Sequence, residues 1–558
     1  MPVSECADCF HPPRWVLTET NGSRVLTSFP AVDCQCRRDG AVTLNIDVFR
    51  AVLSFLSTSE LIGVSQSSHL FHEEAWKEML SRPVFLNSHK QFASFHHFLA
   101  NGDPVRYCFL RVLSLYNIVA ATDNMVQWSV DALTQIIRSS IHLEKLDILG
   151  CEKLLFSRPQ PDFVSSIASL RHLRHILCSS HVKETHPHAL ELLHNLPQHT
   201  LKSLQFNHFP DMINLLTADF LNLLAQRQPQ LEDVSLTYPS IVKGTWKPFA
   251  NVTVLKITIA DGWIHLPQLV EMFPRAMEVC ASSLTRMFTD PNPAPFEELA
   301  QDPSRVAALA FQDSGRGWPL LHSLSGSSFD LFSLALTCPV RRVVINPYEP
   351  HRAWHEPQRD IIARTRPKRV DLTTSCADYA RPLPSAGPNL LVYDSGPTPG
   401  AVTHLVIGLS VFMFRPPPNV TANILVRGSP VYRLLRQYSG SAPQESIAPF
   451  LQGSRVEYVH LAIAEYFGWG EIDEDAIVNP NPARISDKNA SVAASIDIAL
   501  LVSGIAATAP TIRAVVLTIS MREQSVWEIQ RQDGHLMSRR LEQFAGRRLV
   551  REEERYRP

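Results

Sequence analysis

Hydrophobic residues recur along most of the chain in a pattern typical of β-strands. Beyond residue 105, a unit returns in which an apolar residue, two variable residues, an aliphatic residue, one variable residue and another apolar residue follow one another. The alternation within each unit predicts a strand with one buried face. Clear copies begin at Leu110, Leu143, Leu201, Leu231, Val252, Val306, Val340, Val402, Val456 and Ile512, a weaker copy begins at Leu173, and another ends at Leu372.

Apolar residues at helical spacing precede several of these units. Leu133, Ile136 and Ile137, for example, come before the unit at Leu143, and their spacing predicts a helix before the strand. A strand and a helix that repeat in register predict an α/β solenoid with parallel strands on one face, because a single unit cannot bury both of its faces and neighbours must stack. The alternative is a non-repetitive α/β domain, in which any strand would show this pattern.

A different pattern occupies residues 44–80, where short apolar runs have helical spacing. We expect Asp47 to cap a first helix. Ser57 and Glu60 have the spacing of a capping box and are expected to begin a second helix, and Ser68 is expected to cap a third. Three helices in so short a segment bury too little surface to be very stable alone. The module is therefore expected to pack against another body.

This segment resembles the F-box, a helical module that docks on the Skp-family adaptor of cullin ubiquitin ligases. The residues that match the family pattern are Leu44, Asp47, Val48, Val52, Leu53, Leu56, Leu61, Val64, Ser65, Phe71 and Trp76. Asn45 stands where the family has a Pro that belongs to the adaptor-contacting surface. The resemblance implies an adaptor-binding surface made by Leu44, Asn45, Ile46, Val48, Val52, Leu53, Leu56, Leu61 and Val64. The alternative is a three-helix cap on a larger domain, with no adaptor.

The strand and helix units resemble leucine-rich repeats. The best copy is the segment 142–154, where Cys151 occupies the turn position of the cysteine-containing variety, whereas beyond residue 257 the spacing becomes irregular. Together the two resemblances are to F-box proteins with C-terminal irregular leucine-rich repeats, of the divergent fungal type. They imply the substrate receptor of an SCF-type ubiquitin ligase, which binds the Skp-family adaptor, through it a cullin, and a protein client. Catalysis would reside in the partner subunits, no cofactor is implied, and the compartment would be cytoplasmic or nuclear.

The expected organisation is a small docking module followed by one elongated α/β body. Residues 1–40 are expected to be a poorly ordered leader, 41–82 the F-box-like module, 83–520 an irregular solenoid with Pro-rich loops, and 521–558 a charged C-terminal helix or tail. Residues between the buried aliphatic positions of the strands should face the client on the concave surface. They are Lys145, Asp147, Ser203, Gln205, Asp233, Ser235, Lys256, Arg342, Arg369, Asp371, Tyr458 and His460.

Composition argues against nucleotide chemistry and against binding to a polyanion. The chain of 558 residues has 41 Pro and 22 Gly, and a Gly-poor chain offers few places where bare backbone can surround a phosphate. A net charge of −2 gives no global field for nucleic acid or an anionic membrane. The N-terminal residues show no apolar run of a secretory signal, so the cysteines are expected to be reduced thiols.

Candidate chemistry is sparse. No Walker, dinucleotide-binding, nucleophile-elbow or HExxH motif occurs. Cys6, Cys9, Cys34 and Cys36 could supply four thiols to zinc, although Cys34 and Cys36 are closer than structural sites usually have them, and a reduced leader is the alternative. A His-rich segment at 181–194 fits no standard metal spacing. The remaining alternatives are a repeat scaffold that binds partners without any ligase and, more remotely, an enzyme.

Overall fold

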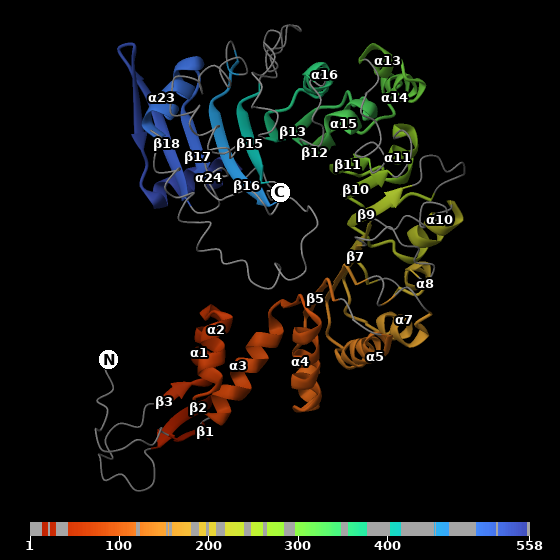
Figure 1. The fold of residues 1–558 in the computed structure, drawn as a ribbon, viewed down its shortest axis with the longest axis vertical. Coiled ribbons are helices and arrows are strands. Elements are labelled where there is room, and N and C mark those ends of the chain that lie inside the picture. The colour runs from red at the N-terminus through yellow and green to blue at the C-terminus, as the bar shows by residue number, and fades with distance from the viewer. Residues whose placement is uncertain are drawn as a thin grey trace, which may run out of the picture. The chain divides into compact units, whose positions relative to one another are not determined.

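The structure is a computed structural model. It describes residues 14–20, 23–29, 43–118, 123–151, 155, 159–179, 189–196, 200–207, 218–238, 247–259, 265–283, 296–346, 355–375, 402–413, 451, 454–467, 498–519 and 523–554. The chain divides into two compact units. Unit 1 holds residues 1–215 and 223–233, and unit 2 holds residues 216–222 and 234–558. Figure 1 shows the elements of each unit.

Unit 1 begins with a small antiparallel sheet of β1 (Arg14–Thr20), β2 (Ser23–Phe29) and β3 (Thr43–Asn45). The paired strands β1 and β2 lie within the segment that we expected to be a poorly ordered leader. Three helices follow, α1 (Ile46–Phe55), α2 (Thr58–Ser65) and α3 (His69–Ser81). The three helices therefore occur where the apolar spacing predicts them.

The caps of these helices explain their boundaries. Ser57 and Glu60 form the predicted capping box of α2, and the Ser68 side chain accepts a hydrogen bond from the backbone N–H of Phe71 at the start of α3. The prediction for α1 is wrong by two residues. Its cap is Asn45, whose side chain accepts from the backbone N–H of Asp47 at 2.8 Å. Asn and Asp are both good caps, and Asp47 instead lies in the first turn.

The rest of unit 1 alternates parallel strands and helices. The strands are β4 (Val84–Leu86), β5 (Val112–Tyr116), β6 (Lys145–Leu149), β7 (His175–Ser179) and β8 (Ser203–Asn207). The helices are α4 (His89–Ala100), the 3-10 helix η1 (Pro104–Phe109), α5 (Asp123–Ser139), α7 (Pro161–Ala168) and α8 (Ala189–His194). Helix α10 (Ala218–Arg227) contributes residues to both units.

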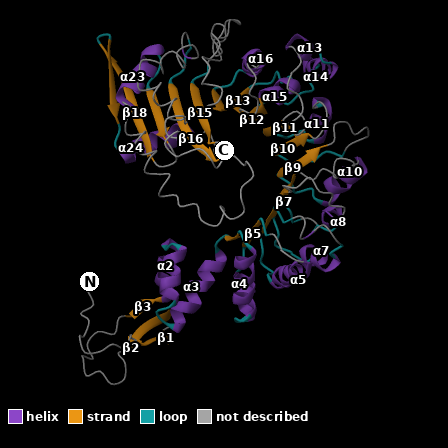
Figure 2. Cartoon of the chain, viewed as in Figure 1, coloured by secondary structure: helices purple, strands orange, loops and turns teal. Residues whose placement is uncertain are grey.

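Unit 2 continues the alternation. After β9 (Asp233–Tyr238), its parallel strands are β10 (Val254–Ile259), β11 (Glu278–Ser283), β12 (Leu321–Ser327), β13 (Val340–Asn346), β14 (Arg369–Ser375), β15 (His404–Met413), β16 (Tyr458–Phe467) and β17 (Ala514–Ile519). The helices are α11 (Leu266–Met272), α13 (Phe296–Ala300), α14 (Pro303–Asp313), α15 (Ser328–Leu334), α16 (His355–Thr365) and α23 (Ile498–Thr508). Figure 2 shows α11 to α16 along one side of β10 to β13.

The C-terminal segment ends the sheet with antiparallel strands. Strands β18 (Glu523–Gln532) and β19 (His535–Arg540) pair with each other, β18 pairs with β17, and helix α24 (Gln543–Glu554) follows. Our expectation for residues 521–558 was a helix or tail without these two strands. Sixteen strands, β4 to β19, follow one another in sequence order in a mostly parallel sheet that is not closed. The predicted α/β class and parallel sheet are confirmed.

One backbone contact recurs between successive strand–helix units. In many units, a carbonyl just before the strand accepts the N–H groups of two consecutive residues of the following unit, as when the Arg111 carbonyl accepts from Glu144 at 2.8 Å and Lys145 at 3.1 Å. The acceptors of this kind are Glu144, Arg174 and Lys202 in unit 1 and Thr253, Met277, Lys368, Thr403 and Glu457 in unit 2. The recurrence places these positions in equivalent sites of a repeating unit, although the spacing in sequence varies.

Two parts of the predicted strand series are wrong. The unit at Val306 lies in α14, because Asp302 caps a helix there and Pro303 occupies its first turn. Strands β11 and β12 were missed, because the third position of the unit is Ala281 in one and Gly326 in the other. A Cβ on Gly326 would lie 2.4 Å from the Ala281 carbonyl oxygen, so the close approach of the two strands requires glycine there.

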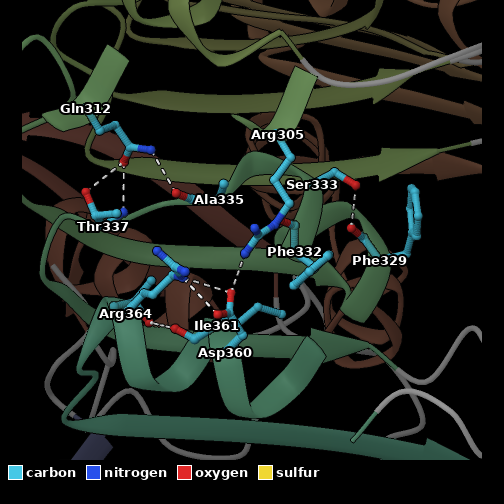
Figure 3. A network of polar contacts seen from close by, with 11 residues as sticks. Arg305, Gln312, Phe329, Phe332, Ser333, Ala335, Thr337, Asp360, Ile361 and Arg364 are labelled. Carbon is cyan, nitrogen blue, oxygen red and sulfur yellow. Dashed lines mark hydrogen bonds and ion pairs between the residues drawn. The ribbon is translucent and has the colours of Figure 1, made fainter. Parts of the chain in front are cut away.

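A buried polar network joins helices of successive units on the helical side of the sheet (Figure 3). Arg305 in α14 is 4% exposed, and its Nη2 contacts Oδ2 of Asp360 in α16 at 2.7 Å. Its guanidinium also lies 4.0 Å from the ring centroid of Phe332 in α15. Burial lowers the pKa of Arg305, and the charge of Asp360 opposes that shift. The network therefore fixes α14, α15 and α16 to one another.

Candidate protein-interaction surfaces

Helices α1 and α2 expose four large apolar side chains, which are called the apolar stripe: Val48, Val52 and Phe55 on α1 and Ile62 on α2. These four side chains are between 48% and 88% exposed, and Phe55 is the most exposed of them. Val48, Val52 and Phe55 follow one another at four- and three-residue spacing, so they lie on one face of α1. The structure thus places large apolar side chains in contact with solvent on a folded helix.

The opposite face of α1 forms the core of the module. Ile46, Phe49 and Leu53 are buried against Leu61 of α2 and Ala75 of α3. The Phe49 ring stacks on the Phe71 ring of α3 at a centroid distance of 4.5 Å. This packing fixes the direction in which α1 presents its other face.

Charged contacts hold α1 on α3. Glu74 is buried, and its carboxylate accepts hydrogen bonds from Nε of Arg50 at 2.6 Å and from Nζ of Lys77 at 2.9 Å. Burial raises the pKa of Glu74, but the hydrogen bonds from Arg50 and Lys77 outweigh it and hold that pKa below its usual value. Arg82 donates from Nη2 to the Leu53 carbonyl at 2.8 Å. This hydrogen bond gives a partner to one of the carbonyls in the last turn of α1.

The residues predicted to bind an adaptor separate into three groups. Asn45, Val48 and Val52 are exposed, whereas Leu56 and Val64 are half-buried. Ile46, Leu53 and Leu61 are buried inside the module. Leu44 belongs to β3, and its side chain lies outside the described part of the structure.

Sequence reasoning missed two members of the stripe, Phe55 and Ile62. The helical spacing contained a signal for Phe55, because it lies seven residues after Val48 and three after Val52. No comparable spacing pointed to Ile62, which belongs to the next helix.

In unit 1, several predicted client-facing residues contact one another within a strand or across neighbouring strands. Lys145 Nζ lies 3.0 Å from Oδ2 of Asp147, which also accepts from Ser114 Oγ at 2.8 Å. Farther along, Asp233 Oδ2 accepts from Ser203 Oγ and Gln205 Nε2, both at 3.0 Å. Asp147 and Asp233 on these strands thus already accept hydrogen bonds through Oδ2.

In unit 2, Arg342 and Arg369 share one carboxylate. Arg342 donates from Nε to Oδ2 of Asp371 at 2.7 Å, and Arg369 donates from Nε to Oδ1 at 2.7 Å. His460 lies nearby and contacts Thr518 Oγ1 through Nε2 at 2.9 Å. Burial, followed by the charge of Arg369, lowers the pKa of His460 to about 4. Of the other predicted residues, Lys256 is half-buried and Ser235 is buried.

Helix α24 packs on strands β16, β17 and β18, on the side of the sheet that carries Tyr458. Val550 of α24 is buried with Tyr458, Ala514, Val516 and Val526 of the sheet, and Leu541 and Leu549 pack against this cluster. Glu553 Oε2 lies 2.7 Å from Nε2 of His404, and its Oε1 lies 3.0 Å from Nη2 of Arg513. Tyr458 was predicted to face a client, but it is buried while α24 is in place.

The metal candidates lie mostly outside the described part of the chain. Cys6, Cys9, Cys34 and Cys36 lie outside the described residues, as do His181, His186 and His188. Among the residues that the structure does describe, no group of three or more His, Cys, Asp or Glu side chains could hold a metal ion.

None of the described helices combines the length and the apolar character needed to cross a membrane. A scan against protein-family models and a search of the curated proteins both found no match to this chain.

Proposed function

We propose that this chain is the substrate-recognition subunit of an SCF-type cullin ubiquitin ligase. The apolar stripe on α1 and α2 binds a Skp-family adaptor, which connects the chain to a cullin, and the open face of the sheet binds a protein client. Catalysis resides in the partner subunits. The observation that carries the proposal is the exposure of Val48, Val52, Phe55 and Ile62 on helices whose other face is fixed in a core.

The energetics favour a partner for this stripe. Burying a Val, Ile or Phe side chain stabilises a complex by about 1.5–3 kcal/mol, and exposed apolar patches mark interaction sites. Phe55 is 88% exposed and therefore has the most surface to bury. Helices that present apolar residues at three- and four-residue spacing commonly bind in a partner's groove.

Asn45 is compatible with this proposal. It stands where F-box modules carry a Pro, and its side chain caps α1 through the N–H of Asp47. Pro and a capping side chain both favour the start of a helix. The direction of α1 can therefore be retained, while the contact that the family's Pro makes with the adaptor is replaced by that of an exposed amide.

A second candidate function is a partner-binding repeat scaffold without a ligase, in which the N-terminal helices cap the sheet. This alternative is favoured by a contact between α3 and η1, where the rings of Trp76 and Phe109 meet edge to face at 5.4 Å. Capping by α3 accounts for that contact. It does not account for the exposed stripe, which lies on α1 and α2.

Co-purification separates these two functions. The full chain is expressed together with a Skp-family adaptor and a cullin, and each protein is followed through affinity and size-exclusion chromatography. We expect a ternary complex that contains all three proteins. Recovery of the intact, folded chain without adaptor would favour the scaffold function instead.

A further inference from the structure

Three basic residues form a row across the open face of unit 2. Arg342 on β13 pairs in register with Arg369 on β14, which pairs with His404 on β15. Residues at paired positions of neighbouring strands lie about 5 Å apart. The positions that follow them in each strand, Val343 and Val370, are buried on the helical side. The basic row therefore lies on the face of the sheet that points away from the helices. It consists of Arg342, Arg369 and His404.

The charges in this row are only partly balanced. Asp371 carries one negative charge against the guanidinium groups of Arg342 and Arg369, so these three residues have a net charge of +1 (2 − 1). Burial is the largest cause of the lowered pKa of the nearby His460; the charge of Arg369 adds to it and the charge of Asp371 opposes it. An excess of guanidinium charge on a partly desolvated surface attracts anions.

Helix α24 already binds this face through a carboxylate. Its Glu553 contacts His404 of the basic row and Arg513, while its apolar Val550 packs on the neighbouring strands. Farther along the row, Arg342 keeps 29% of its side chain exposed. Its guanidinium has five N–H donors and uses Nε and Nη2 for Asp371, so it has the capacity to donate to a further oxygen.

We propose that Arg342, supported by Arg369, anchors an acidic side chain of the client, an Asp or Glu in a peptide segment that lies across β13 and β14. That the ligand is a client rests on the proposed function, but the acidic-ligand site itself does not. Asp371 and Glu553, which contact the basic row, are both carboxylates, so the row already accommodates the ligand that we expect. Bidentate contacts between Arg and a carboxylate give both affinity and orientation.

The test uses the full chain and a fluorescein-labelled peptide of alternating Glu and Gly, followed by fluorescence anisotropy. A Gln and Gly peptide is the uncharged probe. Arg342→Gln is the test variant, because Arg369 still pairs with Asp371 in it. Arg341→Gln is the matched control. Arg341 is exposed and adjacent to Arg342 in the sequence, and its substitution removes the same charge.

We expect the acidic peptide to bind the wild-type chain and the uncharged peptide not to bind. Arg342→Gln should weaken binding about tenfold, which corresponds to the loss of one charge-assisted hydrogen bond. Arg341→Gln should leave binding within about twofold, because a single exposed charge is screened by salt. Equal weakening by both variants would reduce the effect to diffuse charge and overturn the proposal, as would an absence of wild-type binding.

A third variant should act in the opposite direction. Asp371→Asn removes the carboxylate that the two arginines share, so the acidic peptide should bind several-fold more tightly. Weaker binding by a folded Asp371→Asn chain would contradict the proposal. Adaptor binding is measured on the same proteins and should be unchanged in all three variants. Loss of the ligase function and loss of the acidic site are thereby distinguished.

Discussion

Val52 and Leu53 are consecutive residues of α1 with opposite environments. Val52 is 48% exposed, and Leu53 is 1% exposed in the core that α1 shares with α2 and α3. A side chain that is available for binding and a side chain that the core requires are therefore neighbours in the sequence. A substitution at Leu53 tests the stability of the module, whereas a substitution at Val52 tests what the module contacts.

Leu53→Ala should destabilise the helical module by about 2–5 kcal/mol, because it removes a fully buried side chain and leaves a cavity. Val52→Ala should change the stability by less than about 1 kcal/mol, since its side chain is already half exposed to water. Urea unfolding of the two variants, followed by hydrogen exchange in α1 to α3, measures the difference. Equal losses from both variants would mean that the two faces of α1 are not distinguished in this way.

Arg305 should contribute more to stability than an exposed arginine in a similar pair. Arg305→Ala removes a buried guanidinium that pairs with Asp360 and stacks on Phe332, and it is expected to destabilise unit 2 by about 2–3 kcal/mol, since Asp360 keeps its pair with Arg364. The control is Arg316→Ala, which breaks an exposed pair with Glu271 at 2.9 Å and should cost less than about 1 kcal/mol. Chemical denaturation gives both values, and a control as damaging as Arg305→Ala would refute the structural importance of the network.

His460 should make stability depend on pH below neutrality. Its pKa is about 4 in the folded chain against an ordinary 6.5, so the unfolded state takes up its proton first as the pH falls. Above pH 6.5 both states are neutral and the full contribution is present. Between pH 6.5 and 4 the free energy of unfolding should fall by about 3 kcal/mol.

Denaturant unfolding of the wild-type chain and of His460→Gln over pH 4–8 measures this contribution. The substitution removes the titrating imidazole, so the pH dependence between pH 6.5 and 4 should be shallower in the variant. Identical slopes in the two proteins would contradict the depressed pKa of His460.

Helix α24 should depend on Val550 for its position. Val550→Asp places a charge in the cluster with Tyr458 and Val526, and it should release α24 from the sheet, because a buried unpaired charge is strongly unfavourable. Phe544→Asp is the control, since Phe544 lies in the same helix and is exposed. Hydrogen exchange should rise in α24 in the first variant and not in the second. Unchanged protection in Val550→Asp would argue against the packing of α24 on this face.

Local spacing predicted much of the fold because most strand units keep an aliphatic residue at each inward position. The units at Val340 and Ile512, for example, became β13 and β17. The prediction failed where a contact between strands demanded a small residue. Gly326 must leave room for the Ala281 carbonyl, and neither residue matches an apolar pattern. The unit at Val306 failed because the three-residue spacing from Val306 to Leu309 suits a helix, and Asp302 and Pro303 begin one there.

The surfaces were harder to predict than the elements. Spacing identified α1 as amphipathic, but it could not separate Val52 from Leu53, because which side of a helix is covered depends on its packing partners. The contact between Glu553 and His404 joins residues far apart in sequence, and nothing in the local pattern of α24 indicates it. Burial of Tyr458 follows from the same long-range packing.

The central claim is that α1 and α2 bind a Skp-family adaptor, and isothermal titration calorimetry with the purified adaptor tests it most directly. We expect the wild-type chain to bind and Val52→Asp to bind at least about thirtyfold more weakly, as for a residue at the centre of an interface. The matched control is Val306→Asp, because Val306 is 51% exposed on a different helix, and its binding should equal that of the wild type. An adaptor that does not bind the folded wild-type chain, or that binds Val52→Asp equally well, would contradict the account.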